Sequence, residues 1–168
     1  EEKHITAYST PVAITVEGRT MVVVTQTNDG WKGIDPKTGE VQRRVRDIPD
    51  PYQIGYSPDR KWFVVAGNRL NRVDIYAANG DDLKLVKVVP QSKTPSHIAF
   101  SADSQNAFVT LQGSHELVAV DLETLQPAWK MKVGRTPAGV VTTADGRHLL
   151  VGVMDDHHVA VVDWQKRE

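Results

Sequence analysis

One sequence pattern recurs four times along this chain of 168 residues, with a period of about 42 residues. An X-Pro step opens each copy, at Thr10-Pro11, Asp50-Pro51, Thr94-Pro95 and Thr136-Pro137. A polar turn follows the first apolar run of each copy and reads VEGRT, SPDRK, SADSQ or TADGR. The third apolar run ends in GIDPKTGE, DIYAANGD, AVDLETLQ or AVVDWQKR. Such a fixed period is typical of folds in which one supersecondary unit stacks on copies of itself.

The apolar runs inside each copy have the length and composition of β-strands. In the third copy they read HIAFS, NAFVTL, ELVAVDL and PAWKMKV, which are short, rich in β-branched and aromatic residues, and separated by turn residues. No long segment has helical periodicity. The sequence therefore predicts an all-β fold, a β-propeller built of four-stranded antiparallel blades. A β-sandwich is the alternative, but it does not explain the fixed period.

We expect residues 1–168 to form a single, partial propeller domain with about four blades. The expected blade ranges are approximately 10–47, 48–91, 92–133 and 134–168. The first three copies each end with an outer strand, near 41–45, 83–89 and 127–133, whereas the fourth copy stops after its third strand. The N-terminal segment 4–9, HITAYS, is a candidate to supply the missing outer strand by strand exchange.

The repeat in residues 133–164, VGRTPAGVVTTADGRHLLVGVMDDHHVAVVDW, resembles the YVTN-type β-propeller repeat. That family belongs with surface-layer, lactonase-like and cytochrome-d1-like propellers, and the resemblance extends over about residues 10–164. It implies a ring of seven or eight blades, of which this chain would supply a part. Either a second copy completes the ring as a dimer, or the remaining blades belong to a longer parent protein. It also implies a bacterial protein in a periplasmic or extracellular setting.

Composition narrows the classes of partner and chemistry. Charged residues make up 24% of the chain and the formal net charge is -1, so no overall positive field favours nucleic acid. No apolar run approaches the roughly 18 residues of a membrane span, so we expect no membrane insertion. The absence of cysteine excludes disulfides, thiolate catalysis and cysteine-ligated metals.

Strand topology assigns the histidines to one face of the propeller. In a four-stranded meander, the connection between the second and third strands lies at the same end as the connection to the next blade. The candidate ligand-binding residues at this end are His97, His115, His157, Arg135 and Gln53. The strongest single candidate is His97, because it lies where strands converge on the central channel. Equivalent positions of the other copies hold Ala13, Gln53 and Gly139, so the fold does not require histidine there.

The DDHH segment is the candidate metal site, with Asp155, His157 and His158 as ligands. Imidazole nitrogen and carboxylate oxygen together suit a divalent ion. Neighbouring residues on a strand point in opposite directions, however, so His157 and His158 could share an ion only from a loop. A solvated polar loop is the alternative for this segment. Arg135 likewise has two interpretations, as a clasp for a ligand carboxylate or as a tie between neighbouring blades.

No motif for nucleophilic, zinc-dependent, phosphate-binding or dinucleotide chemistry occurs. The leading hypothesis is a non-catalytic binding module that presents a His-rich loop face to a small ligand or a partner protein. The resemblance implies an alternative, a periplasmic enzyme that is haem-d1-linked or metal-dependent and lactonase-like, with haem or a divalent metal as its cofactor. A purely structural role in a surface assembly is the third hypothesis.

Overall fold

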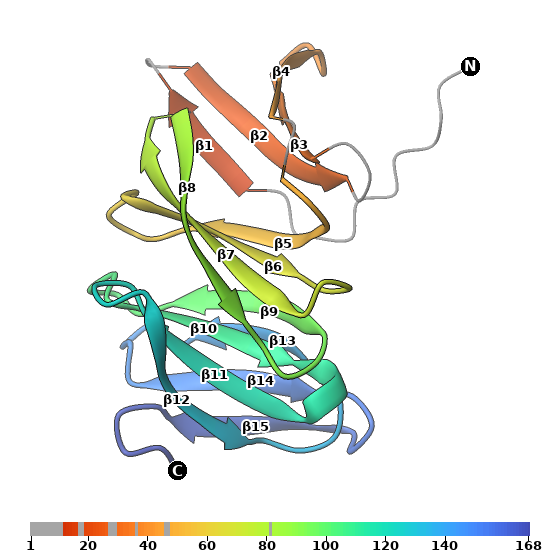
Figure 1. The fold of residues 1–168 in the computed structure, drawn as a ribbon, viewed down its shortest axis with the longest axis vertical. Helices are drawn as coiled ribbons and strands as arrows, with labels where there is room; N and C mark the ends of the chain where they lie inside the picture. The colour runs from red at the N-terminus through yellow and green to blue at the C-terminus, as the bar shows by residue number, and fades with distance from the viewer. Residues whose placement is uncertain (1–11, 17–18, 27–29, 36, 46–47, 81) are drawn as a thin grey trace.

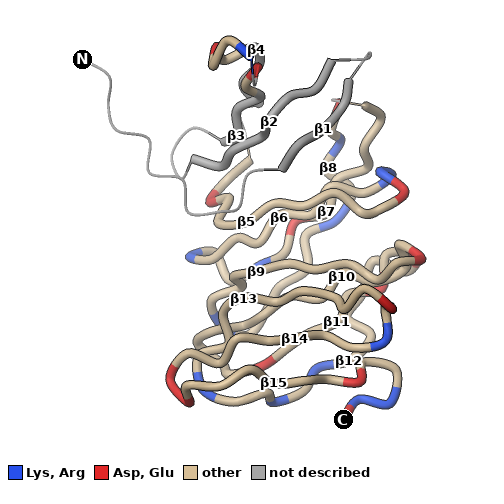
Figure 2. Tube along the Cα trace, turned by 180° about the vertical axis from the view of Figure 1, so that it is seen from behind, with Lys and Arg blue, Asp and Glu red and all other residues tan. Residues whose placement is uncertain are grey.

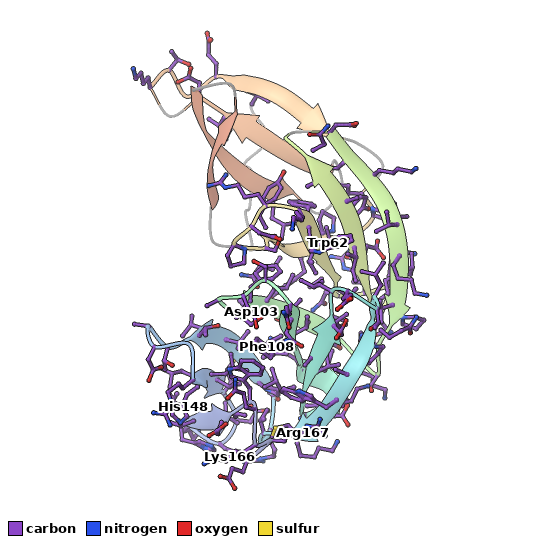
Figure 3. The ribbon with its side chains drawn as sticks, turned by 90° about the vertical axis from the view of Figure 1, so that its left-hand side faces the viewer. Trp62, Asp103, Phe108, His148, Lys166 and Arg167 are labelled. Carbon is purple, nitrogen blue, oxygen red and sulfur yellow. The ribbon has the colours of Figure 1, made fainter. Side chains whose placement is uncertain are left out.

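A computed structural model shows four antiparallel sheets that follow one another along a curved stack (Figures 1 and 3). The structure describes residues 12–16, 19–26, 30–35, 37–45, 48–80 and 82–168. In each sheet the spatial order of the strands equals their order in the chain, which is the meander of a propeller blade. We number these sheets as blades 1 to 4. The segment 4–9, proposed for strand exchange, lies outside the described residues.

The blades divide the strands as follows. Blade 1 contains β1 (Val12–Val16), β2 (Arg19–Gln26), β3 (Gly30–Ile34) and β4 (Val41–Val45). Blade 2 contains β5 (Pro51–Tyr56), β6 (Trp62–Gly67), β7 (Arg72–Asn79) and β8 (Asp82–Pro90). Blade 3 contains β9 (Pro95–Phe100), β10 (Asn106–Leu111), the 3₁₀ turn η1 (Gln112–Ser114), β11 (Glu116–Asp121) and β12 (Gln126–Lys132). Blade 4 contains β13 (Pro137–Thr142), β14 (His148–Val153) and β15 (His158–Asp163).

The architecture confirms the predicted all-β propeller of four-stranded antiparallel blades, and it is partial rather than closed. In the described part of the chain, blade 4 has three strands and no outer strand after β15. None of the described segments is an α-helix long and apolar enough to cross a membrane. Lys, Arg, Asp and Glu lie mainly in the turns along both edges of the stack, as Figure 2 shows.

The repeated polar turns close the hairpin between the first two strands of a blade. In blade 3 the Ser101 hydroxyl donates to Asp103 (2.5 Å), whose carboxylate accepts the backbone N–H of Gln105 (3.0 Å). In blade 4 the Thr143 hydroxyl donates to Asp145 (2.6 Å) in the same way. Asp and Ser are favoured in turns because their side chains bond to nearby backbone groups. These recurring motifs therefore have a structural role.

Each blade has a forward face toward the blade that follows and a backward face toward the one before. The forward face of blade 3 packs against the backward face of blade 4 in one buried cluster. Phe108 is central to it, with its ring centroid 5.2 Å from that of Trp164 and 6.0 Å from that of Trp129 (Figure 3). Blades 2 and 3 bury a second cluster in the same manner. Apolar burial between blades, at about 1.5 to 3 kcal/mol per fully buried large side chain, is the main force that holds the stack together.

Candidate functional site

The loop end of the blades contains a repeated junction between one blade and the next. The residue just before the third strand of blades 2, 3 and 4 has a left-handed backbone, with φ of 52° at Asn71, 61° at His115 and 52° at His157. The Asn71 side-chain oxygen accepts the backbone N–H of Thr94 (2.8 Å). In the next blade, Nδ1 of His115 accepts the backbone N–H of Thr136 (3.0 Å). We call this arrangement the junction clamp.

The main chain of the clamp residue holds the incoming segment as well. The carbonyl of Asn71 accepts the N–H of Gln91 (2.8 Å), and the carbonyl of His115 accepts the N–H of Val133 (3.3 Å). Each clamp residue thus binds the chain at two points as it enters the next blade. Sequence reasoning grouped His115 with the ligand-binding residues and missed this structural role. The sequence contains one indication of this role. Asn71 occupies the same repeat position, and Asn is enriched among residues with a left-handed backbone.

Arg135 is bound within the same junction. Its backbone N–H and its Nε donate to the carboxylate of Asp156 at 2.7 and 2.6 Å, and Nη2 donates to the carbonyl of Asp155 (2.8 Å). These donors hold the pKa of Asp156 below its usual value. The hydroxyl of Thr136 donates to the Asp155 carboxylate (2.5 Å). These bonds hold the segment that leads into β13 against the β14–β15 turn, so Arg135 and its partners all belong to blade 4.

Two of the DDHH side chains are thus engaged by protein groups. Nδ1 of His158 lies 3.2 Å from the Asp156 carbonyl, and His157 and His158 both border a small depression of about 320 Å³. Among the described residues, the structure contains no group of three or more His, Asp or Glu side chains arranged to hold a metal ion. The metal site at Asp155, His157 and His158 stays a prediction.

His97 and Gln53 lie apart from the clamps, on the innermost strands. These strands border a larger pocket of about 780 Å³. Its lining residues are Gln53, Ile54, Gly55, Tyr56, His97, Ile98, Phe100, Gly139, Val140, Val141, Leu150, Gly152 and Val159. The Gln53 side-chain oxygen accepts the backbone N–H of Ile98, so Gln53 ties blade 2 to blade 3. Its amide therefore has a structural partner beside the pocket.

The imidazole of His97 is held in place from its own blade and from blade 2. Its Nδ1 shares a hydrogen bond with the Ser96 hydroxyl (2.9 Å), and its ring meets Tyr52 edge-on with centroids 5.8 Å apart. Burial lowers the pKa of His97 below its usual value, so the ring is neutral at pH 7. A side chain at Gly139, the equivalent position of blade 4, would meet no atom within 4 Å, so space is open there.

The predicted site residues therefore fall into two groups. The pairing of Leu111 with Pro95 places the start of β9 at the same end of blade 3 as the turn that carries His115. His115, Arg135, Asp155 and Asp156 meet at the junction, whereas His97 and Gln53 border the inner pocket. Tyr52 and Ser96, which orient His97, were both missed, and for Tyr52 the reason is that nothing in the repeat marks a contact that crosses from another blade.

The sequence model of a family described as YNCE-like β-propeller matches residues 2–168. The chain belongs to the YNCE-like β-propeller family. This membership confirms the resemblance to YVTN-type propellers that the repeats indicate. No curated protein matches the chain in sequence.

Solved structures show the same architecture as this YNCE-like propeller. A functionally unknown protein from Desulfotomaculum acetoxidans has a TM-score of 0.74 at 14% identity, covering 96% of this chain and 56% of its own. A putative 6-phosphogluconolactonase from Bacteroides uniformis has a TM-score of 0.73 at 16% identity. The match covers 92% of this chain and 51% of that protein. Hydrazine synthase from Kuenenia stuttgartiensis has a TM-score of 0.66 at 24% identity. The match covers 77% of this chain and 38% of that protein. These likenesses show the fold, and the chain spans roughly half or less of each protein's length.

Proposed function

We propose that this chain is a non-catalytic binding module, and that the pocket beside His97 receives a small, mainly apolar ligand with one hydrogen-bonding group. The observation that carries the proposal is a neutral, half-buried imidazole, oriented by Ser96 and Tyr52, at the edge of a pocket of about 780 Å³. Small-molecule sites have this size and combine apolar walls with a few fixed polar groups. Pre-orientation of the ring reduces the entropic cost of binding.

The atoms that His97 offers to a ligand follow from its hydrogen bonds. Its Nδ1 is engaged by Ser96, and either tautomer leaves Nε2 as a donor or an acceptor. Apolar lining from Ile98, Phe100 and Val140 would cover the rest of the ligand. A neutral aromatic molecule with one N–H or O–H group suits this arrangement better than an anion, because no cationic side chain borders the pocket among the described residues.

The enzymatic alternative, haem-linked or lactonase-like, has weaker support. One solved structure is named a putative 6-phosphogluconolactonase, but at 16% identity that likeness concerns the fold. Resemblance also underlies the proposal that the protein works in a periplasmic or extracellular setting.

The test uses indole as a probe, because it has an apolar ring and one N–H donor. Titration into the chain, followed by calorimetry and by the ring signals of the histidines in NMR spectra, should give saturable binding that perturbs His97. His97→Ala should weaken it roughly fivefold, the effect of one lost hydrogen bond of about 1 kcal/mol. His158→Ala, which removes an imidazole outside this pocket, is the matched control and should bind indole unchanged. Equal binding by His97→Ala, or no saturable binding by the wild type, would reject the proposal.

A further inference from the structure

The turn between β14 and β15 brings three side chains with metal-binding donor atoms to one depression. Met154, His157 and His158 all line the depression of about 320 Å³ at this turn. The N–H of His157 bonds to the Met154 carbonyl (3.2 Å), so these two residues are the first and the fourth of a tight turn. All three side chains are exposed. Their thioether sulfur and imidazole nitrogens are therefore accessible to a solute without a change of fold.

The backbone of His157 lets two adjacent histidines share this depression. On a regular strand, neighbouring side chains point in opposite directions. His157, however, has a left-handed backbone with φ of 52°, and β15 begins only at His158. The alternation of a strand therefore does not apply to this pair. A loop conformation, which is the condition for the two imidazoles to share one ion, is met at this turn.

The hydrogen bond of His158 is of the kind that orients a metal ligand. Its Nδ1 lies 3.2 Å from the carbonyl oxygen of Asp156. A carbonyl can only accept, so in the neutral ring the proton is on Nδ1 and the lone pair is on Nε2. Histidines that bind metals almost always donate their other ring N–H to a carbonyl, a carboxylate or water in this way. Within the described part of the chain, the structure records no hydrogen bond to the imidazole of His157, so its ring nitrogens are available too.

The carboxylates of this turn already have protein partners, which changes the metal that the turn suits. Asp155 accepts the hydroxyl of Thr136 (2.5 Å). Asp156 accepts two donors of Arg135. Because the described residues contain no group of three His, Asp or Glu side chains that could hold a metal ion, a site here needs a donor of another type, and Met154 supplies it. A thioether with two imidazoles favours Cu(I), since soft sulfur ligands select Cu(I) and imidazole also suits copper.

We propose that Met154, His157 and His158 bind one Cu(I) ion at the turn between β14 and β15. Compared with the predicted divalent site, this set exchanges a carboxylate for a thioether, and the preferred ion becomes soft and monovalent. The two neighbouring carboxylates and the guanidinium of Arg135 leave one excess negative charge beside the depression, which attracts a cation. None of the three ligands borders the pocket beside His97, so this proposal and the proposed function can fail separately.

Titration of the whole chain with Cu(I), without oxygen and in competition with a coloured Cu(I) chelator, tests the site. The wild type should take up one Cu(I) ion per chain. Met154→Leu keeps the side-chain volume and removes the sulfur, so it should weaken binding at least about tenfold, the loss that removal of even an outer-shell partner causes. Met131→Leu is the matched control and should bind as the wild type does, because Met131 lies on β12 and does not line the depression. No uptake by the wild type, or equal affinity in Met154→Leu, would overturn the proposal.

The histidines and the neighbouring carboxylate complete the experiment. His157→Ala and His158→Ala should each weaken Cu(I) binding at least about tenfold, whereas His148→Ala, at the other end of β14, should not. Asp155→Asn should leave the Cu(I) affinity unchanged, and X-ray absorption should show both sulfur and nitrogen bound to copper. Because the three ligands are exposed, the metal-free variants should melt as the wild type does. Unchanged affinity in either ligand histidine variant, or binding that depends on Asp155 and not on Met154, would overturn the proposal.

Discussion

Blades 3 and 4 carry the same kind of forward face, yet only one of them is core. Phe108, Leu117 and Ala119 of blade 3 are fully buried, whereas Leu150, Val159 and Val161, at the same positions of blade 4, are half-buried or exposed. Both sets are apolar and both lie on the second and third strands of a blade. The difference shows that residue type follows the repeat, while burial depends on whether another blade lies alongside.

The largest expected effect comes from truncating the two faces at the same position. Phe108→Ala should lower the free energy of unfolding by about 3 to 5 kcal/mol, because it leaves a cavity among Trp129, Trp164 and the backward face of blade 4. Leu150→Ala should lower the free energy of unfolding of the dilute chain by less than half of that amount, because no blade covers Leu150 there. Urea unfolding of both variants measures the difference. Equal losses would mean that the two faces are packed alike.

Gly55 and Gly139, on two inner strands, allow a crowded position to be compared with an open one. A Cβ at Gly55, on the covered forward face of blade 2, would lie 2.8 Å from a ring carbon of Phe100, so Gly55→Ala should destabilise by about 1 to 3 kcal/mol. Gly139→Ala should be neutral, because no atom lies within 4 Å of the new methyl group. Thermal unfolding of the two variants checks this, and a loss at Gly139 would show that the inner pocket is less open than described.

Truncation of the two clamp histidines, His115 and His157, should give a smaller difference in stability. His115→Ala removes the acceptor for the Thr136 N–H and should cost about 1 kcal/mol, whereas His115→Asn should recover most of it. His157→Ala should leave the stability of the dilute chain unchanged, because its imidazole bonds to no described residue. Chemical unfolding at low protein concentration separates these outcomes. A similar loss at both histidines would contradict the distinction between engaged and open clamps.

The smallest expected effect concerns pH. Burial lowers the pKa of His97 in the folded chain, so the folded state binds fewer protons than the unfolded state, whose histidine titrates near pH 6.5. The free energy of unfolding therefore decreases as the pH falls below about 6.5, and it stops decreasing below the pKa of His97 in the folded chain. His97→Gln should abolish this pH-dependent loss of stability, whereas His158→Gln should leave it in place. Unfolding curves between about pH 7 and pH 5 measure it; identical slopes in wild type and His97→Gln would refute it.

The candidate binding residues were predictable only in part. Spacing alone placed Gln53, His97 and Gly139 at equivalent positions, and the structure shows all three beside one pocket. His97 is oriented by Ser96 of its own blade and by Tyr52 of blade 2, and burial lowers its pKa. No repeat encodes the contact with Tyr52, because a contact between blades depends on the twist and spacing of both sheets. His115 shows the converse, since its chemistry suggested a ligand site while its position in the junction made it a clamp.

The sequence by itself determined the unit: four copies, the order of strands within a blade, the polar turns and the apolar faces. These are local properties, set by alternation along a strand, by turn residues and by the X-Pro steps. The tertiary structure alone decided which faces are buried, which clamps are occupied and where the inner pocket lies. Those features depend on the neighbour of each blade, and a blade at the end of a stack has the same sequence pattern as one in the middle.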